Sequence, residues 1–240
     1  MQDRLVLGYH AVSDLSTSPL TVTRAALRRQ VAELVGRGYV GTTFNRAVLG
    51  PASQRCLAVT FDDGESNVIQ HAAPVLAELG VPGTVFVPVS PVGSPGLLGW
   101  EDLAALSEAG WEVGSHTLSH ARLTDLDDAS LRRELRDSRL TIEDMLGRPC
   151  RSIAYPYGDS DPRVRAAAAA AGYTAGCTTD GTTSADALRW PRVGVHGNDG
   201  HVLFRLKTSR FGRVLRGTPL SASFERAGRA VRTLAYLRQR

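Results

Sequence analysis

The sequence has little of what marks a membrane protein or a disulfide-rich one. No stretch of its 240 residues approaches the roughly 18 consecutive apolar residues of a membrane-spanning helix. Residues 1–5 show no basic region leading into an apolar segment and a small-residue cleavage site, as a secretory signal does. Three widely spaced cysteines without a C-x-x-C pair predict reduced, partly buried thiols: Cys56, Cys150 and Cys177. We therefore expect a cytoplasmic protein.

The length and composition suit one enzyme-sized domain, and the charge sets its C-terminal end apart. Hydrophobic residues make up 42% of the chain, which is ordinary for a globular protein and too high for disorder. Residues 205–240 carry nine arginines and one lysine against a single acid, Glu225. We expect a catalytic domain over residues 1–217 and a basic amphipathic helix over residues 218–240, where apolar residues recur at helical spacing.

Short apolar runs alternate with amphipathic runs along the chain. Cys56–Phe61 and Gly83–Val87 are typical of buried strands, and the segment between them carries apolar residues at helical spacing up to Gly80. The same patterns predict strands at 5–9, 111–114, 152–155 and 173–177, and helices at 100–109, 127–146 and 164–171. Asp159 and Asp161 are expected to cap the last of these helices. This alternation predicts an α/β fold with a parallel sheet, open or closed into a barrel.

Two polar clusters each follow a predicted strand, where such folds place their chemistry. Asp62 and Asp63 are adjacent, so in an extended chain one carboxylate can take a metal while its neighbour points to the other face. Alone, this doublet is typical of a turn. His116 and His120 have the i,i+4 spacing that brings two imidazoles together on one turn of helix. Two histidines and one carboxylate form a known catalytic zinc set, so the two clusters together predict a metal site.

Three motifs resemble those of the polysaccharide deacetylases, carbohydrate esterase family four, also called the NodB-homology family. They are Thr60–Gly64, His116–His120 and Tyr155–Gly158, within a similarity that covers roughly residues 5–200. The resemblance implies a single-domain distorted (β/α) barrel with fewer than eight regular strands. It also implies a hydrolase of carbon–nitrogen bonds other than peptide bonds, which removes an N-acetyl group from an amino sugar or glycan.

The resemblance implies roles for individual residues. Asp63, His116 and His120 would hold one divalent metal ion, zinc by preference, with cobalt, nickel or manganese as alternatives. Asp62 would be the general base, and the backbone N–H of Tyr157 would stabilise the oxyanion. Amide hydrolysis needs these parts, because a metal-bound water is a good nucleophile near neutral pH and a preorganised N–H donor offsets the developing charge.

The sequence departs from the common family pattern at several positions. Ala154 stands where many members carry an arginine that braces the base, and Arg192 is a candidate to replace it. Leu7–Val12 resembles the start of the exopolysaccharide deacetylases, in which permutation moves the acid-bearing histidine motif to the N-terminus. We therefore expect His10 to be the general acid, with His196 as the alternative. A packing or capping role for His10 is also open.

Other functions are less compatible with these residues. A non-catalytic carbohydrate-binding derivative of the fold would have lost a ligand or the base, yet all four residues are present. Deacylases of non-carbohydrate amides tend to lack the adjacent pair of aspartates. No nucleic-acid-binding motif accompanies the arginines, so we expect no nucleic acid. The basic helix either packs on the domain or contacts an anionic membrane peripherally, which would suit an N-acetylated substrate on a lipid carrier.

Overall fold

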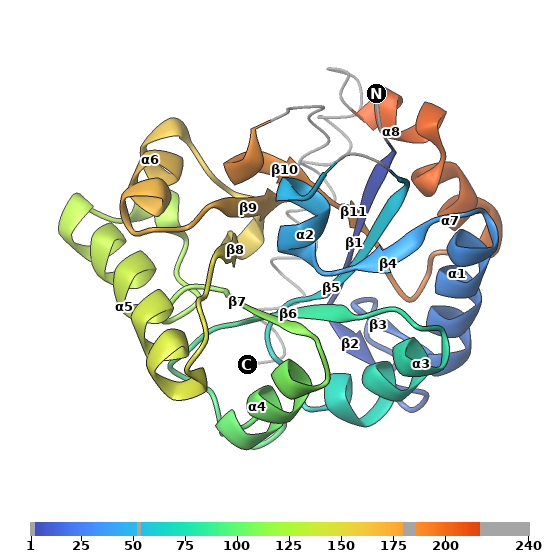
Figure 1. Ribbon diagram of the computed structural model, residues 1–240, viewed down its shortest axis with the longest axis horizontal. Helices are drawn as coiled ribbons and strands as arrows, with labels where there is room; N and C mark the ends of the chain where they lie inside the picture. The colour runs from blue at the N-terminus through green and yellow to red at the C-terminus, as the bar shows by residue number, and fades with distance from the viewer. Residues whose placement is uncertain (1–2, 52–53, 180–185, 217–240) are drawn as a thin grey trace.

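The protein is built around one parallel sheet with helices outside it (Figure 1). The computed structural model describes residues 3–51, 54–179 and 186–216. The predicted basic helix over residues 218–240 lies outside this range, so the proposed domain division stays a prediction. Within the described residues, no helix has the length and apolar character to cross a bilayer. The three cysteines are buried and free, in agreement with the prediction.

Eight strands follow one another across the sheet, all of them parallel. In spatial order they are β10 (Trp190–Pro191), β9 (Ala175–Thr178), β8 (Ser152–Ala154), β7 (Glu112–Ser115), β6 (Gly83–Val87), β5 (Cys56–Phe61), β1 (Arg4–Tyr9) and β11 (Val193–Gly194). A further strand, β4 (Val40–Thr42), pairs with the first half of β5, while β6 pairs with its second half. The short strands β2 (Ala11–Val12) and β3 (Thr21–Val22) form a separate pair.

Residues 190–194 join the two ends of this sheet. β10 pairs with β9 and β11 pairs with β1, and Arg192 alone separates β10 from β11. The backbone N–H of Arg192 donates to Thr178, and that of Val195 donates to Gly8. The sheet is therefore a nearly closed barrel, and its two closing strands have only two residues each. This confirms the predicted distorted (β/α) barrel.

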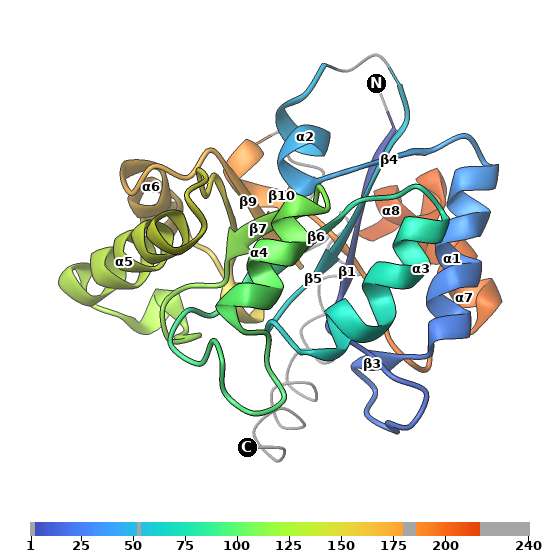
Figure 2. The same cartoon turned by 60° about the horizontal axis from the view of Figure 1, so that its bottom comes forward.

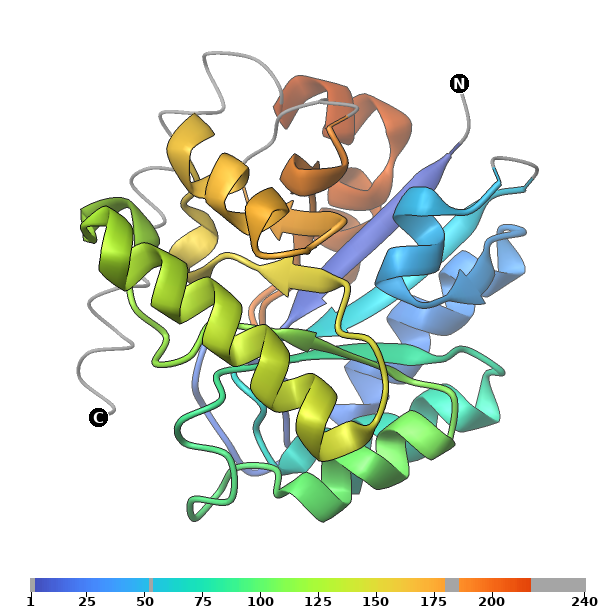
Figure 3. The same cartoon turned by 60° about the vertical axis from the view of Figure 1, so that its left-hand side comes forward.

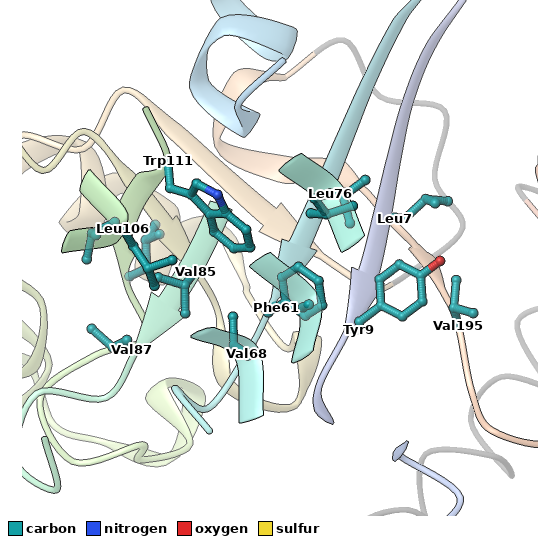
Figure 4. Close-up of a cluster of buried hydrophobic side chains, with 14 of the residues drawn as sticks. Leu7, Tyr9, Phe61, Val68, Leu76, Val85, Val87, Leu106, Trp111 and Val195 are labelled. Carbon is teal, nitrogen blue, oxygen red and sulfur yellow. The ribbon is translucent and has the colours of Figure 1, made fainter. Parts of the chain in front are cut away.

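Helices cover the outside of the barrel (Figures 2 and 3). They are α1 (Arg24–Gly36), α3 (Ala73–Glu78), α4 (Trp100–Glu108), α5 (Asp128–Leu146), α6 (Pro162–Ala170), α7 (His201–Thr208) and α8 (Arg210–Arg216). The longest, α5, begins where the Asp127 side chain accepts the N–H of Ser130 at 2.7 Å, and it ends at Gly147, whose φ is 63°. Buried apolar side chains fill the layer between strands and helices (Figure 4). In this layer Phe61 stacks on Tyr9 and Trp111, with centroids 5.6 and 5.8 Å apart.

One helix closes the barrel instead of covering it. The apolar residues of α2 (Phe44–Leu49) pack with Val6, Ala58 and Ala175 near the starts of three strands. Arg4, at the start of β1, donates to the carbonyl groups of Val48 and Gly50. The amino end of the barrel is thereby closed, so chemistry is confined to the opposite end, where the strands finish.

The segment after β5 differs from the single helix expected up to Gly80. Val68–Ala72 form a π-helical turn, and the regular helix α3 begins only at Ala73. Pro74 accounts for the change, because it has no N–H to donate to the carbonyl four residues earlier.

Candidate metal and catalytic site

The predicted site residues meet at the carboxyl end of the barrel. Asp62 and Asp63 directly follow β5, His116 directly follows β7, and Tyr157 lies three residues after β8. His10 directly follows β1, whose last residue pairs with the last residue of β5. Because parallel strands point the same way, their ends bring residues from distant parts of the chain to one edge.

Asp63, His116 and His120 form a set that fits a metal ion. Their ligand atoms all lie within 4.8 Å of one another. Asp63 Oδ1 is 3.5 Å from His116 Nε2 and 3.3 Å from His120 Nε2. This oxygen is buried and has no hydrogen-bond partner among the described residues. A buried carboxylate oxygen facing two imidazole nitrogens calls for a positive charge between them, and an Asp-His-His set suits a divalent ion such as zinc.

His116 is held ready to coordinate. Its Nδ1 lies 2.7 Å from the carbonyl oxygen of Ala154, so Nδ1 carries the proton and donates it. Nε2 is then left with its lone pair on the side of Asp63. Burial lowers the pKa of His116 to about 4, although the nearby carboxylates of Asp62 and Asp63 act in the other direction. The imidazole is therefore neutral at physiological pH, as a metal ligand must be.

The segment from His116 to His120 is a loop, so the predicted turn of helix is wrong. The φ angles of Thr117 and His120 are 70° and 62°, in the left-handed region. Side chains set this shape: Ser115 Oγ accepts from Thr117 N at 3.0 Å, and Thr117 Oγ1 accepts from His120 N at 3.0 Å. The two imidazole centroids are still only 4.8 Å apart. The histidines thus converge, but by a side-chain-bonded loop rather than by helical periodicity.

Backbone strain is concentrated in the three motif loops. Four non-glycine residues have positive φ within the described chain: Asp63, Thr117, His120 and Tyr157. Each such conformation costs on the order of 1–3 kcal/mol, and a β-branched residue such as Thr117 is especially unusual there. Strain of this kind persists only where surrounding contacts impose it, and it is common at functional sites.

Asp62 is paired with Arg192, the residue expected to replace the arginine that is missing at Ala154. Arg192 Nη1 and Nη2 donate to the two carboxylate oxygens at 2.7 and 2.6 Å, and both side chains are buried. Nη1 also donates to Thr60 Oγ1 at 3.0 Å. Burial raises the pKa of Asp62, but the charge and hydrogen bonds of Arg192 outweigh that effect and hold it below its usual range. Asp62 is therefore ionised.

Tyr157 forms the wall beside His120. Its φ is 61°, and its ring meets the His120 ring edge-to-face with centroids 5.0 Å apart. The Arg122 guanidinium lies over the Tyr157 ring, 4.2 Å from its centroid. Arg122 also pairs with Asp159. The role of the Tyr157 N–H as an oxyanion donor stays a prediction.

The two aspartates expected to cap α6 have different functions. Asp161 does cap the helix, because its carboxylate accepts from Val164 N at 2.7 Å. Asp159 does not, since its partner is Arg122 on the loop after His120. Local sequence patterns can predict a helix cap, but they do not predict an ion pair with a residue 37 positions away.

The two candidates for the general acid lie in different surroundings. His10 Nδ1 is buried without a hydrogen-bond partner among the described residues. A charge on His10 lies near enough to lower the pKa of both Asp62 and Asp63. His196 Nδ1 is 3.8 Å from Asp199, whose carboxylate also accepts from Lys207 at 2.5 and 2.6 Å. The structure therefore groups His10 with the two aspartates and His196 with an ion-pair cluster.

One residue of this site was missed by sequence reasoning. The carboxylate of Glu134, on α5, accepts from three donors of the loop between the two histidines. Glutamate on a charged helix is ordinary in a sequence, and no local pattern marks this one as different from its neighbours.

Comparison with known proteins agrees with this site. A family model described as polysaccharide deacetylase matches residues 50–176, more than half of the chain. The matched range contains Asp62, Asp63, His116, His120 and the Tyr155–Gly158 motif, whereas His10, Arg192 and His196 lie outside it.

Two curated relatives are similar to this chain. YxkH of Bacillus subtilis, a candidate polysaccharide deacetylase, is 30% identical over 187 residues, covering 75% of this chain and 66% of the relative. Chitin deacetylase 1 of Cryptococcus neoformans is 34% identical over 147 residues, covering 60% of this chain and 29% of the relative. The chain thus spans less than two thirds of the length of either relative.

A solved structure shows the same architecture. The crystal structure of a polysaccharide deacetylase from Bacillus cereus has a TM-score of 0.77 at 27% identity, covering 85% of this chain and 68% of the other.

Proposed function

Because the chain belongs to the polysaccharide deacetylase family, we propose that it hydrolyses N-acetyl groups on the amino sugars of a glycan. One observation carries the proposal. Asp63 Oδ1 faces the Nε2 atoms of His116 and His120 at 3.5 and 3.3 Å, beside an ionised Asp62. A metal-binding set and an uncoordinated carboxylate in one place are the parts that amide hydrolysis by water requires.

The residues divide the work of the reaction. Asp63, His116 and His120 would hold a divalent ion, which supplies Lewis acidity toward water and the acetyl oxygen. Asp62 would take a proton from the attacking water. Its two oxygens are engaged by Arg192, but each carboxylate oxygen has a second lone pair with which it can accept.

The departing sugar amine must gain a proton as the carbon–nitrogen bond breaks. We assign that proton to His10, whose buried Nδ1 has no hydrogen-bond partner in the described part of the chain. The backbone N–H of Tyr157 would donate to the oxyanion of the tetrahedral intermediate, in a segment already held at positive φ. Zinc is the ion we propose, since Asp-His-His with open positions is a catalytic zinc set.

The substrate class follows from the relatives. One of them is by name a chitin deacetylase, so we propose a polymer or oligomer of N-acetylglucosamine type for this chain. A cytoplasmic location and a lipid-linked glycan are further parts of the proposal. The lipid-linked glycan rests on the five arginines among residues 217–240, which suit contact with an anionic membrane.

Mass spectrometry tests the reaction directly. The full chain, stripped of metal and reloaded with zinc or cobalt, is incubated with chitin oligosaccharides and with β-1,6-linked N-acetylglucosamine oligomers. We expect products that have lost one or more acetyl groups, and far less of them with Asp62→Asn. Absence of deacetylation in every zinc- and cobalt-loaded reaction would exclude the proposed activity.

Vesicle binding tests the membrane part separately. Full-length protein is sedimented with anionic or neutral vesicles at low and physiological salt. A full-length variant with Arg226, Arg229 and Arg232 replaced by glutamine serves as the comparison. We expect the wild type to bind anionic vesicles more than the variant does. Equal sedimentation of the two proteins would exclude the proposed membrane contact without bearing on the proposed deacetylase activity.

A further inference from the structure

The loop that carries both histidine ligands is attached to helix α5 by one carboxylate. Glu134 Oε2 accepts from the backbone N–H groups of Leu118 and Ser119, each at 2.9 Å. Glu134 Oε1 accepts from Ser119 Oγ at 2.6 Å. All three donors lie between His116 and His120, so Glu134 binds the segment that joins the two ligands.

That segment needs an external restraint. Thr117 and His120 both have left-handed backbone angles, which L-residues rarely adopt without support. The contacts inside the loop are single hydrogen bonds from Thr117 N and His120 N to neighbouring hydroxyl groups. A charged acceptor with three donors is a stronger restraint than either, because hydrogen bonds to an ionised group are roughly twice as strong as neutral ones.

A second contact joins the same helix face to the last residue of β7, directly before the loop. Ser138 lies four residues after Glu134, hence one turn further along α5. Its Oγ accepts from Ser115 Oγ at 2.9 Å, and Ser115 Oγ in turn accepts from Thr117 N. Helix α5 therefore contacts the chain on both sides of His116.

We propose that Glu134 is a positioning residue of the metal site. By holding the N–H groups of Leu118 and Ser119, it keeps the loop in the one shape that aims both imidazoles at Asp63 Oδ1. Glu134 does not touch the ligand atoms and acts through the backbone between them. The inference rests on the proposed metal site of Asp63, His116 and His120.

A graded series of full-length variants tests it. Ser119→Ala removes one of the three hydrogen bonds, Glu134→Gln removes the charge but keeps one acceptor oxygen, and Glu134→Ala removes all three. The probe is zinc alone, with its dissociation constant measured by competition against a chromophoric chelator. Partners that orient metal ligands typically contribute about 10–100-fold in affinity, so we expect Glu134→Ala to bind zinc that much more weakly. The zinc dissociation constants of Ser119→Ala and Glu134→Gln should lie between those of Glu134→Ala and the wild type.

Glu143 provides the matched control on the same helix. It accepts from Arg139 Nη1 at 2.9 Å and from Cys150 N at 3.0 Å, and neither donor lies in the loop from His116 to His120. Glu143→Ala should lower the apoprotein melting temperature and leave zinc affinity unchanged. If Glu134→Ala does not fold, the gradation of Ser119→Ala and Glu134→Gln decides the matter.

Two negative results have different meanings. A wild-type protein that binds no zinc overturns both the proposed metal site and this inference. Wild-type zinc affinity in the folded Glu134 and Ser119 variants overturns the inference alone.

Discussion

Arg192 holds both carboxylate oxygens of Asp62 although 130 positions separate the two residues in the chain. Arg192 is also the residue between β10 and β11, the strands that join the two ends of the sheet. The same side chain therefore links barrel closure to the candidate base. It contacts Asp62 from the residue between two short strands, whereas the arginine missing at Ala154 would have come from the third motif.

We expect Arg192→Met to destabilise the protein strongly. The substitution leaves the Asp62 carboxylate buried without its counter-charge, and breaking a buried pair in this way costs about 3–5 kcal/mol. Adding Asp62→Leu should restore much of the free energy of unfolding, because no unpaired charge is then left. Urea denaturation of the single and double variants measures both effects. The exposed pair of Arg28 and Glu78 is the control, and Arg28→Met should change little.

Asp62→Asn separates chemistry from metal binding. An amide oxygen cannot take the proton from attacking water, so we expect turnover to fall by about 10²–10⁴-fold. Asp63, His116 and His120 are untouched, so zinc content should equal that of the wild type. Steady-state kinetics and elemental analysis on the same preparation check the two statements. Near-native turnover would place the base elsewhere.

His116→Ala and His120→Ala should lose metal and activity together. Each removes one of three protein ligands, and the neutral imidazole of His116 cannot be replaced by a methyl group. His71→Ala is the control, because His71 is not part of this set. Zinc measured by elemental analysis should fall in both ligand variants and not in the control. A double variant with full zinc occupancy would contradict the assignment.

Much of the barrel could be predicted from sequence because its strands are continuous apolar runs. Cys56–Phe61 and Gly83–Val87 match the predicted strands residue for residue. The site residues were recognisable for a related reason: polar residues directly after a buried strand stand out against it. Asp62, Asp63 and His116 all occupy such positions.

The features that sequence reasoning missed or misassigned depend on tertiary contacts. The loop from His116 to His120 is non-helical, and the donors that Glu134 holds lie 15 and 16 positions before it. Asp159 was wrongly assigned to a helix cap. Its partner, Arg122, is too distant in sequence for a local pattern to indicate the contact. The π-helical turn before Ala73 could have been predicted locally, because a proline within a predicted helix, here Pro74, indicates an interruption of that helix.

The acid sensitivity of the fold should depend in part on Asp3. Burial raises the pKa of this carboxyl, but hydrogen bonds from Tyr39, Arg213 and Arg55 outweigh it and lower the pKa to about 2. The unfolded chain binds its proton near 3.8, so the stabilisation is present above that pH and is lost as the pH falls toward 2. Asp3→Asn should lose less free energy of unfolding than the wild type between about pH 5 and pH 2. Urea titrations at the two pH values test this, and an unchanged pH dependence would show that Asp3 does not contribute.

The choice between His10 and His196 as the general acid can be decided by the leaving group. Gly8 pairs with Gly194, and each histidine lies two residues after its glycine, just beyond the end of β1 or β11. Register alone therefore does not separate them. Their contacts do: His10 Nδ1 has no hydrogen-bond partner among the described residues, while His196 belongs to the cluster of Asp199 and Lys207.

We expect His10→Ala to lower turnover of an N-acetyl sugar by about 10²–10⁴-fold and His196→Ala to have a much smaller effect. An acid matters less when the leaving group departs without a proton. The His10 variant should therefore retain most of its activity on an aryl acetate, whose phenolate is a good leaving group. The measurement is kcat of each variant relative to that of the wild type, on each of the two substrates. An impaired His196 variant that is rescued on the aryl acetate, beside a fully active His10 variant, would reverse the assignment.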